Sequence, residues 1–85
     1  MKITGQKTLD VKKSFGAAVR AWRSHSGISQ EELAERAGLH RTYICDIERG
    51  TRNPSLESIK SLARALEIST ATLLSDGAYP NRDGG

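Results

Sequence analysis

The stretch SQEELAERAGLHRTYICDIERG, residues 29–50, constrains the fold more than any other part of the chain. It begins with a capping box, in which the Ser29 hydroxyl and the Glu32 carboxylate can each accept a hydrogen bond from a free backbone amide. Gly38 can end this helix, because glycine readily adopts the positive φ that such an end requires. A second helix, about residues 41–49, follows after roughly three or four residues. The stretch therefore predicts two short helices joined by a tight turn.

Small and apolar residues within this stretch agree with a helix-turn-helix. Ala34 is small where a crossing helix must come close, and Gly38 lies in the turn. Leu39, Ile44 and Ile47 are apolar where the two helices would share a core. The length of the connection is that of a helix-turn-helix. Because several residue types occur in register, this is a much stronger signal than a single short motif.

Three further helices are predicted from the spacing of their apolar residues. One begins at Val11 after Asp10, which can cap it, and ends at Gly27. Another begins at Pro54-Ser55, and a short last helix covers about residues 70–74. The apolar stripes of the two longer helices consist of Val11, Phe15, Val19, Trp22, Leu56, Ile59, Leu62, Ala63 and Leu66.

The domain boundaries follow from these helices and from the length of 85 residues, which suits one small domain. We expect an all-α, five-helix domain over residues 11–76, a flexible N-terminal arm over residues 1–10 and a disordered tail over residues 77–85. No apolar run approaches the ~20 residues of a membrane span. The N-terminus also lacks the apolar stretch of a signal peptide. We therefore expect a cytoplasmic protein without a membrane partner.

Charge and side-chain chemistry exclude several classes of function. The net charge of +3 permits a polyanionic partner but does not require one. The single cysteine, Cys45, cannot form an intramolecular disulfide or a zinc cluster, and an inert thiol is a simpler interpretation than a redox sensor. His25 and His40 lack ligand partners at metal spacing. Without a catalytic triad or a phosphate-cradling glycine loop, we predict no enzyme, metal, cofactor or small-molecule ligand.

Residues 15–74 resemble the five-helix DNA-binding domain of the phage-repressor and Cro type, the XRE family. The segments that carry the resemblance are SQEELAERAGL, RTYICDIERG and NPSLESIKSLARALEIS. Within that family, LHRTYI followed by IERGTRN is similar to small restriction–modification controller proteins. The resemblance implies a lambda-repressor-like fold. It also implies a transcriptional regulator that binds a pseudo-palindromic operator in double-stranded DNA as a homodimer.

The start of the second helix of a helix-turn-helix meets base edges in the major groove. Arg41 can fork onto guanine N7 and O6, and Thr42 can contact a thymine methyl or a base edge. Tyr43 lies on the flank, within reach of a phosphate or a thymine methyl. Asp46 could accept a hydrogen bond from a cytosine amino group, although an acid is unexpected on a helix that approaches phosphates. The alternative for all four is a solvated surface.

Four further residues are predicted to contact the DNA backbone: Gln30, Arg49, Arg52 and Asn53. Gln30 matches a position where the family commonly has a phosphate-contacting glutamine, and a helix N-terminus suits a phosphate. Arg52 and Asn53 follow the recognition helix. Asn53 could instead shape the turn before Pro54.

Two residue pairs are assigned structural roles. By resemblance, Arg23 and Glu48 match an ion pair that ties the first helix to the end of the third. Leu73 and Leu74 lie on a short terminal helix with few neighbours to cover both. An exposed apolar patch there would suit a two-fold dimer interface. The alternative is that both leucines close the monomer core.

Two other functions remain open at this stage. The chain could be the antitoxin of a toxin–antitoxin pair, or a protein-interaction module that has lost DNA binding. Arg41 and Thr42 on the outer side of the third helix favour DNA. Because no residues remain for a ligand-sensing domain, we expect regulation by concentration alone.

Overall fold

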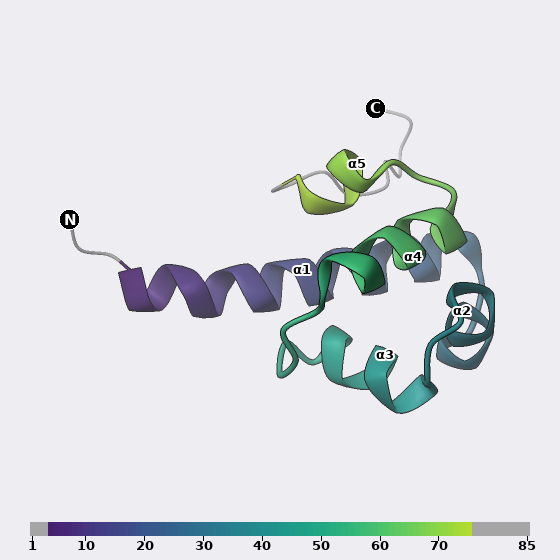
Figure 1. Cartoon of the computed structure of the whole chain (residues 1–85), viewed down its shortest axis with the longest axis horizontal. Coiled ribbons are helices and arrows are strands. Elements are labelled where there is room, and N and C mark those ends of the chain that lie inside the picture. Colours follow the sequence, from purple (N-terminus) through teal and green to yellow (C-terminus); the bar gives the residue numbers. More distant parts are fainter. Residues whose placement is uncertain (1–3, 76–85) are drawn as a thin grey trace.

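The computed structural model describes residues 4–75 of the chain, with side chains from residue 11 onward, as an all-α bundle (Figure 1). Over these residues there is no β-strand, and the five helices confirm the predicted fold class. The helices are α1 (Thr4–Ser26), α2 (Gln30–Ala37), α3 (Arg41–Glu48), α4 (Leu56–Leu66) and α5 (Thr70–Leu74). The predicted disordered tail, residues 77–85, lies outside the described residues.

The first helix is longer than predicted. It begins at Thr4 and not at Val11, so residues 4–10, which were expected to form an arm outside the helix, are helical. Asp10 therefore lies inside the helix and does not cap it. No proline interrupts this segment, and the N-terminal part of α1 projects beyond the other helices (Figure 1). A projecting segment needs no core-facing apolar stripe, so the spacing of apolar residues could not reveal it.

The core lies between the five helices, and α2 contributes to it through its contacts with α3 and α4. Burial of apolar surface is the main favourable term in folding, and each helix from α1 to α5 contributes to it. The largest fully buried side chains are Val19, Leu33, Ile44, Ile47, Leu62 and Leu73. They come from all five helices.

The helix-turn-helix forms largely as predicted. The Ser29 hydroxyl accepts a hydrogen bond from the Glu32 amide at 3.0 Å. The Glu32 carboxylate does not complete a reciprocal capping box and instead pairs with Arg36 at 3.1 Å. Gly38 has φ of 70°, and residues 38–40 connect α2 to α3. The turn is therefore short enough to hold the two helices in one fixed arrangement.

The two leucines of α5 lie on different sides of the helix. Leu73 is only 1% exposed and belongs to the core, whereas Leu74 is 51% exposed. Consecutive residues on a helix point about 100° apart, so Leu74 can face solvent while its neighbour Leu73 faces the core. The prediction that Leu73 lies in a dimer interface is therefore wrong, and Leu74 is the leucine that α5 presents to solvent.

A glycine lets α1 and α3 approach each other closely. A Cβ atom at Gly16 would overlap the carbonyl oxygen of Ile47 and lie 3.1 Å from that of Glu48. Glycine inside a helix costs roughly 0.5–1 kcal/mol relative to alanine. Here the missing side chain of Gly16 permits the backbones of α1 and the C-terminal end of α3 to pack directly against each other.

We expect Gly16→Ala to destabilise the fold by about 1–3 kcal/mol, because the new methyl group must push α3 away from α1. Urea denaturation of the variant and the native chain measures this change. Ala17→Gly, at the exposed neighbouring position, is the control for helix propensity and should cost no more than about 1 kcal/mol. A more stable Gly16→Ala variant, as propensity alone predicts, would contradict the close packing.

Candidate nucleic-acid interface

The third helix has one buried side and one outer side. Ile44 and Ile47 are 0% and 1% exposed, whereas Arg41 and Thr42 are exposed at the N-terminal end of the helix. Within the described part of the chain, the side chains of Arg41 and Thr42 have no hydrogen-bond or ion-pair partner. Figure 1 shows α3 at the edge of the bundle beside α2. The start of α3 is thus free to meet a partner outside the molecule.

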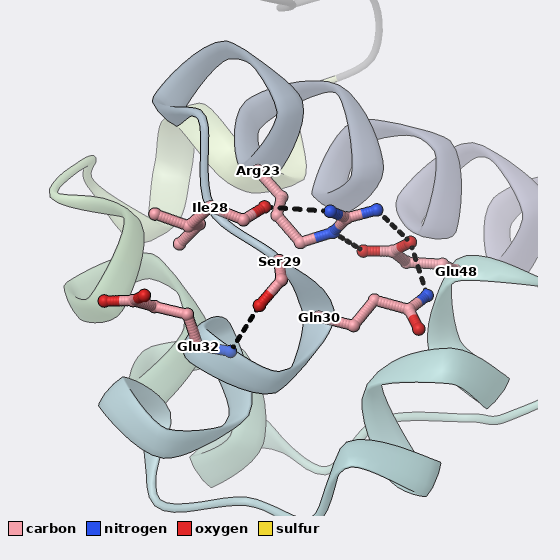
Figure 2. A network of polar contacts seen from close by, with 6 residues as sticks. All are labelled: Arg23, Ile28, Ser29, Gln30, Glu32 and Glu48. Carbon is pink, nitrogen blue, oxygen red and sulfur yellow. Dashed lines mark hydrogen bonds and ion pairs between the residues drawn. The ribbon is translucent and has the colours of Figure 1, made fainter.

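The opposite end of α3 is fixed by a largely buried ion pair (Figure 2). Arg23 donates from Nε to Glu48 Oε2 at 2.7 Å and from Nη2 to Oε1 at 3.1 Å, so the structure forms the pair that the resemblance implied. The side chains of Arg23 and Glu48 are only 16% and 4% exposed. The hydrogen bond to Glu48 raises the pKa of Arg23 above its usual value.

Two further groups join this ion pair. Arg23 Nη1 donates to the carbonyl oxygen of Ile28 at 2.9 Å, and the Gln30 side-chain amide donates to Glu48 Oε1 at 3.0 Å (Figure 2). The network therefore links the end of α1, the loop before α2, the first residue of α2 and the end of α3. Gln30 was predicted only as a phosphate contact, yet it is also part of this internal network. Its amide has a second N–H that the bond to Glu48 does not use.

Asp46 and its neighbours form a second polar cluster, at the turn after α3. Arg52 Nη2 donates to Asp46 Oδ2 at 3.2 Å, and Arg49 Nη2 lies 3.8 Å from Oδ1. The Arg52 guanidinium also stacks over the Tyr43 ring, 4.8 Å from its centroid. The Tyr43 hydroxyl accepts a hydrogen bond from the Ser55 amide at 3.4 Å. These contacts fold the turn back onto the recognition helix.

The remaining candidates have simple surroundings. Asn53 is exposed beside Arg52, and Cys45 is a free, half-buried thiol on α3. Among the residues that the structure describes, no group of three or more His, Cys, Asp or Glu side chains could hold a metal ion. Over the same residues, none of the helices is long and apolar enough to cross a bilayer.

Two features of the structure were not predicted from the sequence. Gly16 controls the approach of α1 to α3, and its only local signal was a glycine in the middle of an otherwise helical run. The stacking of Arg52 on Tyr43 left no signal in the spacing of the residues. It depends on how the turn after α3 folds, because Tyr43 and Arg52 lie more than two helical turns apart in sequence.

Comparison with known proteins agrees with this geometry. A helix-turn-helix family, HTH_3, matches residues 19–73. The chain therefore belongs to the helix-turn-helix family, as its resemblance to XRE-type proteins predicted.

The particular relatives are regulators. The chain is 50% identical over 68 residues to the control protein C.BamHI of Bacillus amyloliquefaciens, covering 79% of this chain and 84% of the relative. It is similar to the restriction–modification controller protein C.AhdI of Aeromonas hydrophila, with a TM-score of 0.71 and 47% identity over 75% of this chain and 96% of that one. It is also similar to SinR, a master regulator for biofilm formation, in a complex with DNA. That match has a TM-score of 0.69 and 35% identity, over 72% of this chain and 98% of the SinR chain in that structure.

We expect Glu48→Ala to reduce the free energy of unfolding by about 3–5 kcal/mol, because it leaves the charge of Arg23 largely buried without its partner. Thermal and urea denaturation of Glu48→Ala, Arg23→Ala and the double variant measure the coupling. The double variant should lose less than the sum of the two single losses. The exposed Glu32–Arg36 pair is the matched control, and its removal should cost no more than about 1 kcal/mol. Strictly additive losses at Arg23 and Glu48 would contradict the role of the pair.

Proposed function

We propose that this chain is a sequence-specific transcriptional regulator that binds operator DNA as a homodimer in the cytoplasm. The observation that carries the proposal is the asymmetry of α3. Its C-terminal end is anchored, while Arg41 and Thr42 at its N-terminal end have no side-chain partner in the part of the chain that the structure describes. This is the end of a recognition helix that enters the major groove. The similarity to SinR, whose structure is known in complex with DNA, supports DNA binding.

Base readout is assigned to the N-terminal turn of α3. An arginine binds guanine through N7 and O6 with two hydrogen bonds, and a threonine suits a thymine methyl or a base edge. Arg41 and Thr42 carry these groups and are exposed. The similarity to C.BamHI and C.AhdI supports a role as a controller of restriction–modification genes.

Backbone contacts are assigned to groups on both sides of this helix. The N-terminus of α2 offers free N–H groups to a phosphate, and Gln30 adds its remaining amide N–H. After α3, Arg49, Arg52 and Asn53 are exposed on the turn. Phosphate contacts position a protein on the duplex without reading sequence, so these groups set its register.

The homodimer is assigned to the surface around Leu74. The exposed large hydrophobic residues of the described chain are Val11, Leu56 and Leu74. A two-fold axis through such a surface pairs the same patch of both subunits. Two recognition helices about 34 Å apart would then match half-sites separated by one turn of DNA.

Selection from a pool of random oligonucleotides with the purified chain tests the whole proposal. We expect enrichment of a pseudo-palindromic sequence whose half-sites are centred about one helical turn apart. Enrichment of no sequence at all would overturn specific DNA binding. Enrichment of an isolated half-site would overturn the dimer.

Arg41→Ala should weaken binding to the selected operator by about 1–3 kcal/mol and relax the preference at one base pair, because a bidentate contact to guanine is lost. Fluorescence anisotropy with the operator and with its single-base variants measures both effects. Arg64→Ala removes the same charge from the exposed side of α4 and is the control. An equal loss on operator and random DNA would show that Arg41 does not read a base.

Leu74→Glu should give a folded monomer with weaker operator binding, because a buried carboxylate is unfavourable in an apolar interface. Analytical ultracentrifugation measures the assembly, and thermal denaturation shows whether the fold persists. Leu73→Glu is the comparison and should unfold the domain, since Leu73 is 1% exposed. A Leu74→Glu variant that remains a dimer of unchanged stability would exclude this interface.

A further inference from the structure

Asp46, on α3, binds several groups of the turn that follows this helix. Each oxygen of its carboxylate faces a guanidinium group, Oδ2 facing Arg52 at 3.2 Å and Oδ1 facing Arg49 at 3.8 Å. Its backbone carbonyl accepts hydrogen bonds from both the amide and the hydroxyl of Thr51, at 3.0 and 3.1 Å. The acid that was unexpected on a DNA-facing helix is therefore engaged by two of the cations predicted to bind DNA.

Arg52 is held from two directions. Its guanidinium lies against the Asp46 carboxylate and over the Tyr43 ring, which itself packs against the core. The side chains of Arg52 and Arg49 remain 45% and 63% exposed, whereas that of Asp46 is 25% exposed. Both arginines are thus accessible from outside, while the one carboxylate of Asp46 compensates part of their charge.

A carboxylate bound by arginines occupies the position that a phosphate would take, because Arg forms the same kind of charge-assisted hydrogen bonds with both groups. A DNA phosphate can gain the full charge of Arg49 or Arg52 only by displacing Asp46. Exposed ion pairs are weak, so such displacement is possible but not free. The geometry points to Asp46 as a specificity-determining residue, which restrains Arg49 and Arg52 from binding the phosphates of any DNA sequence. This inference rests on the proposed function.

The restraint should act mainly on non-specific binding. Binding to random DNA derives essentially all of its free energy from neutralised phosphates. At the operator, Arg41 and Thr42 add base contacts that do not use Asp46. There the base contacts also fix the register, so a released Arg52 must be ordered again to meet one particular phosphate, and this cost offsets the gain in charge. On random DNA the register is not fixed, and a released Arg52 can bind whichever phosphate it meets. Removing the carboxylate should therefore reduce the ratio of operator to random-DNA affinity.

The test uses the full chain and its Asp46→Asn variant, which keeps the side-chain shape and removes the charge. Binding to a random-sequence duplex and to the selected operator is measured over a range of salt concentrations. We expect random-DNA affinity to rise roughly 3- to 10-fold, and the slope of log K against log salt to steepen by about 0.9 for each phosphate gained. Operator affinity should rise less. Glu67→Gln, which removes one negative charge in the connection between α4 and α5, is the matched control and should leave the ratio unchanged.

Arg52→Ala tests the route through which Asp46 acts. In the native background the variant should change random-DNA affinity by less than about 2-fold, because the Arg52 guanidinium is already paired with Asp46. In the Asp46→Asn background it should remove most of the gain. Thermal denaturation accompanies each variant. If Asp46→Asn does not fold, the native-background result decides alone: a slope reduced by about 0.9 would mean a freely available arginine and overturn the inference.

The remaining outcomes are equally decisive. Unchanged random-DNA affinity and slope in Asp46→Asn, with a native chain that binds DNA, would overturn the inference but leave the proposed function intact. A loss confined to the operator, with an altered base preference, would show that Asp46 reads a cytosine instead. A native chain that binds no DNA would overturn the proposed function and this inference together.

Discussion

The presentation of the recognition helix depends on the ion pair between Arg23 and Glu48. Glu48 is 4% exposed in its side chain and accepts two hydrogen bonds from Arg23 and one from Gln30. A buried carboxylate is strongly unfavourable unless such partners are present, so α1, the start of α2 and the end of α3 must meet in one arrangement. An isolated helix as short as α3 is unstable in water. Its orientation must therefore come from these contacts and from the core.

The C-terminal end of α3 is fixed to the rest of the domain, whereas its N-terminal end is exposed. The C-terminal end packs on α1 at Gly16 and carries Glu48, so it cannot move without breaking both contacts. The N-terminal end carries Arg41 and Thr42, which are exposed and have no side-chain partner among the described residues. A fixed C-terminal end and an exposed N-terminal end suit a helix that inserts side chains into a DNA groove. A helix whose backbone is already held in place loses less conformational freedom on binding.

The electrostatic attraction between this protein and the phosphates of DNA is limited. The net charge is only +3, and Asp46 matches part of the positive charge next to the recognition helix within the protein itself. Nucleic-acid affinity that comes from phosphates alone is indifferent to sequence. Because Arg49 and Arg52 are paired with Asp46 while Arg41 is not, the cations beside the recognition helix favour base contacts over phosphate contacts.

The sequence by itself determined the features that depend on neighbours along the chain. Ser29 as a cap, Gly38 as a left-handed stop and the apolar spacing of Ile44 and Ile47 are local, and they predicted the helices and the tight turn. The tertiary structure alone decided which of two adjacent leucines is buried, where α1 begins, that Gly16 meets the backbone of α3, and that Asp46 is bound by two arginines. These outcomes depend on which surfaces meet in space, and one-dimensional spacing does not specify the rotation of a short helix or the path of a turn.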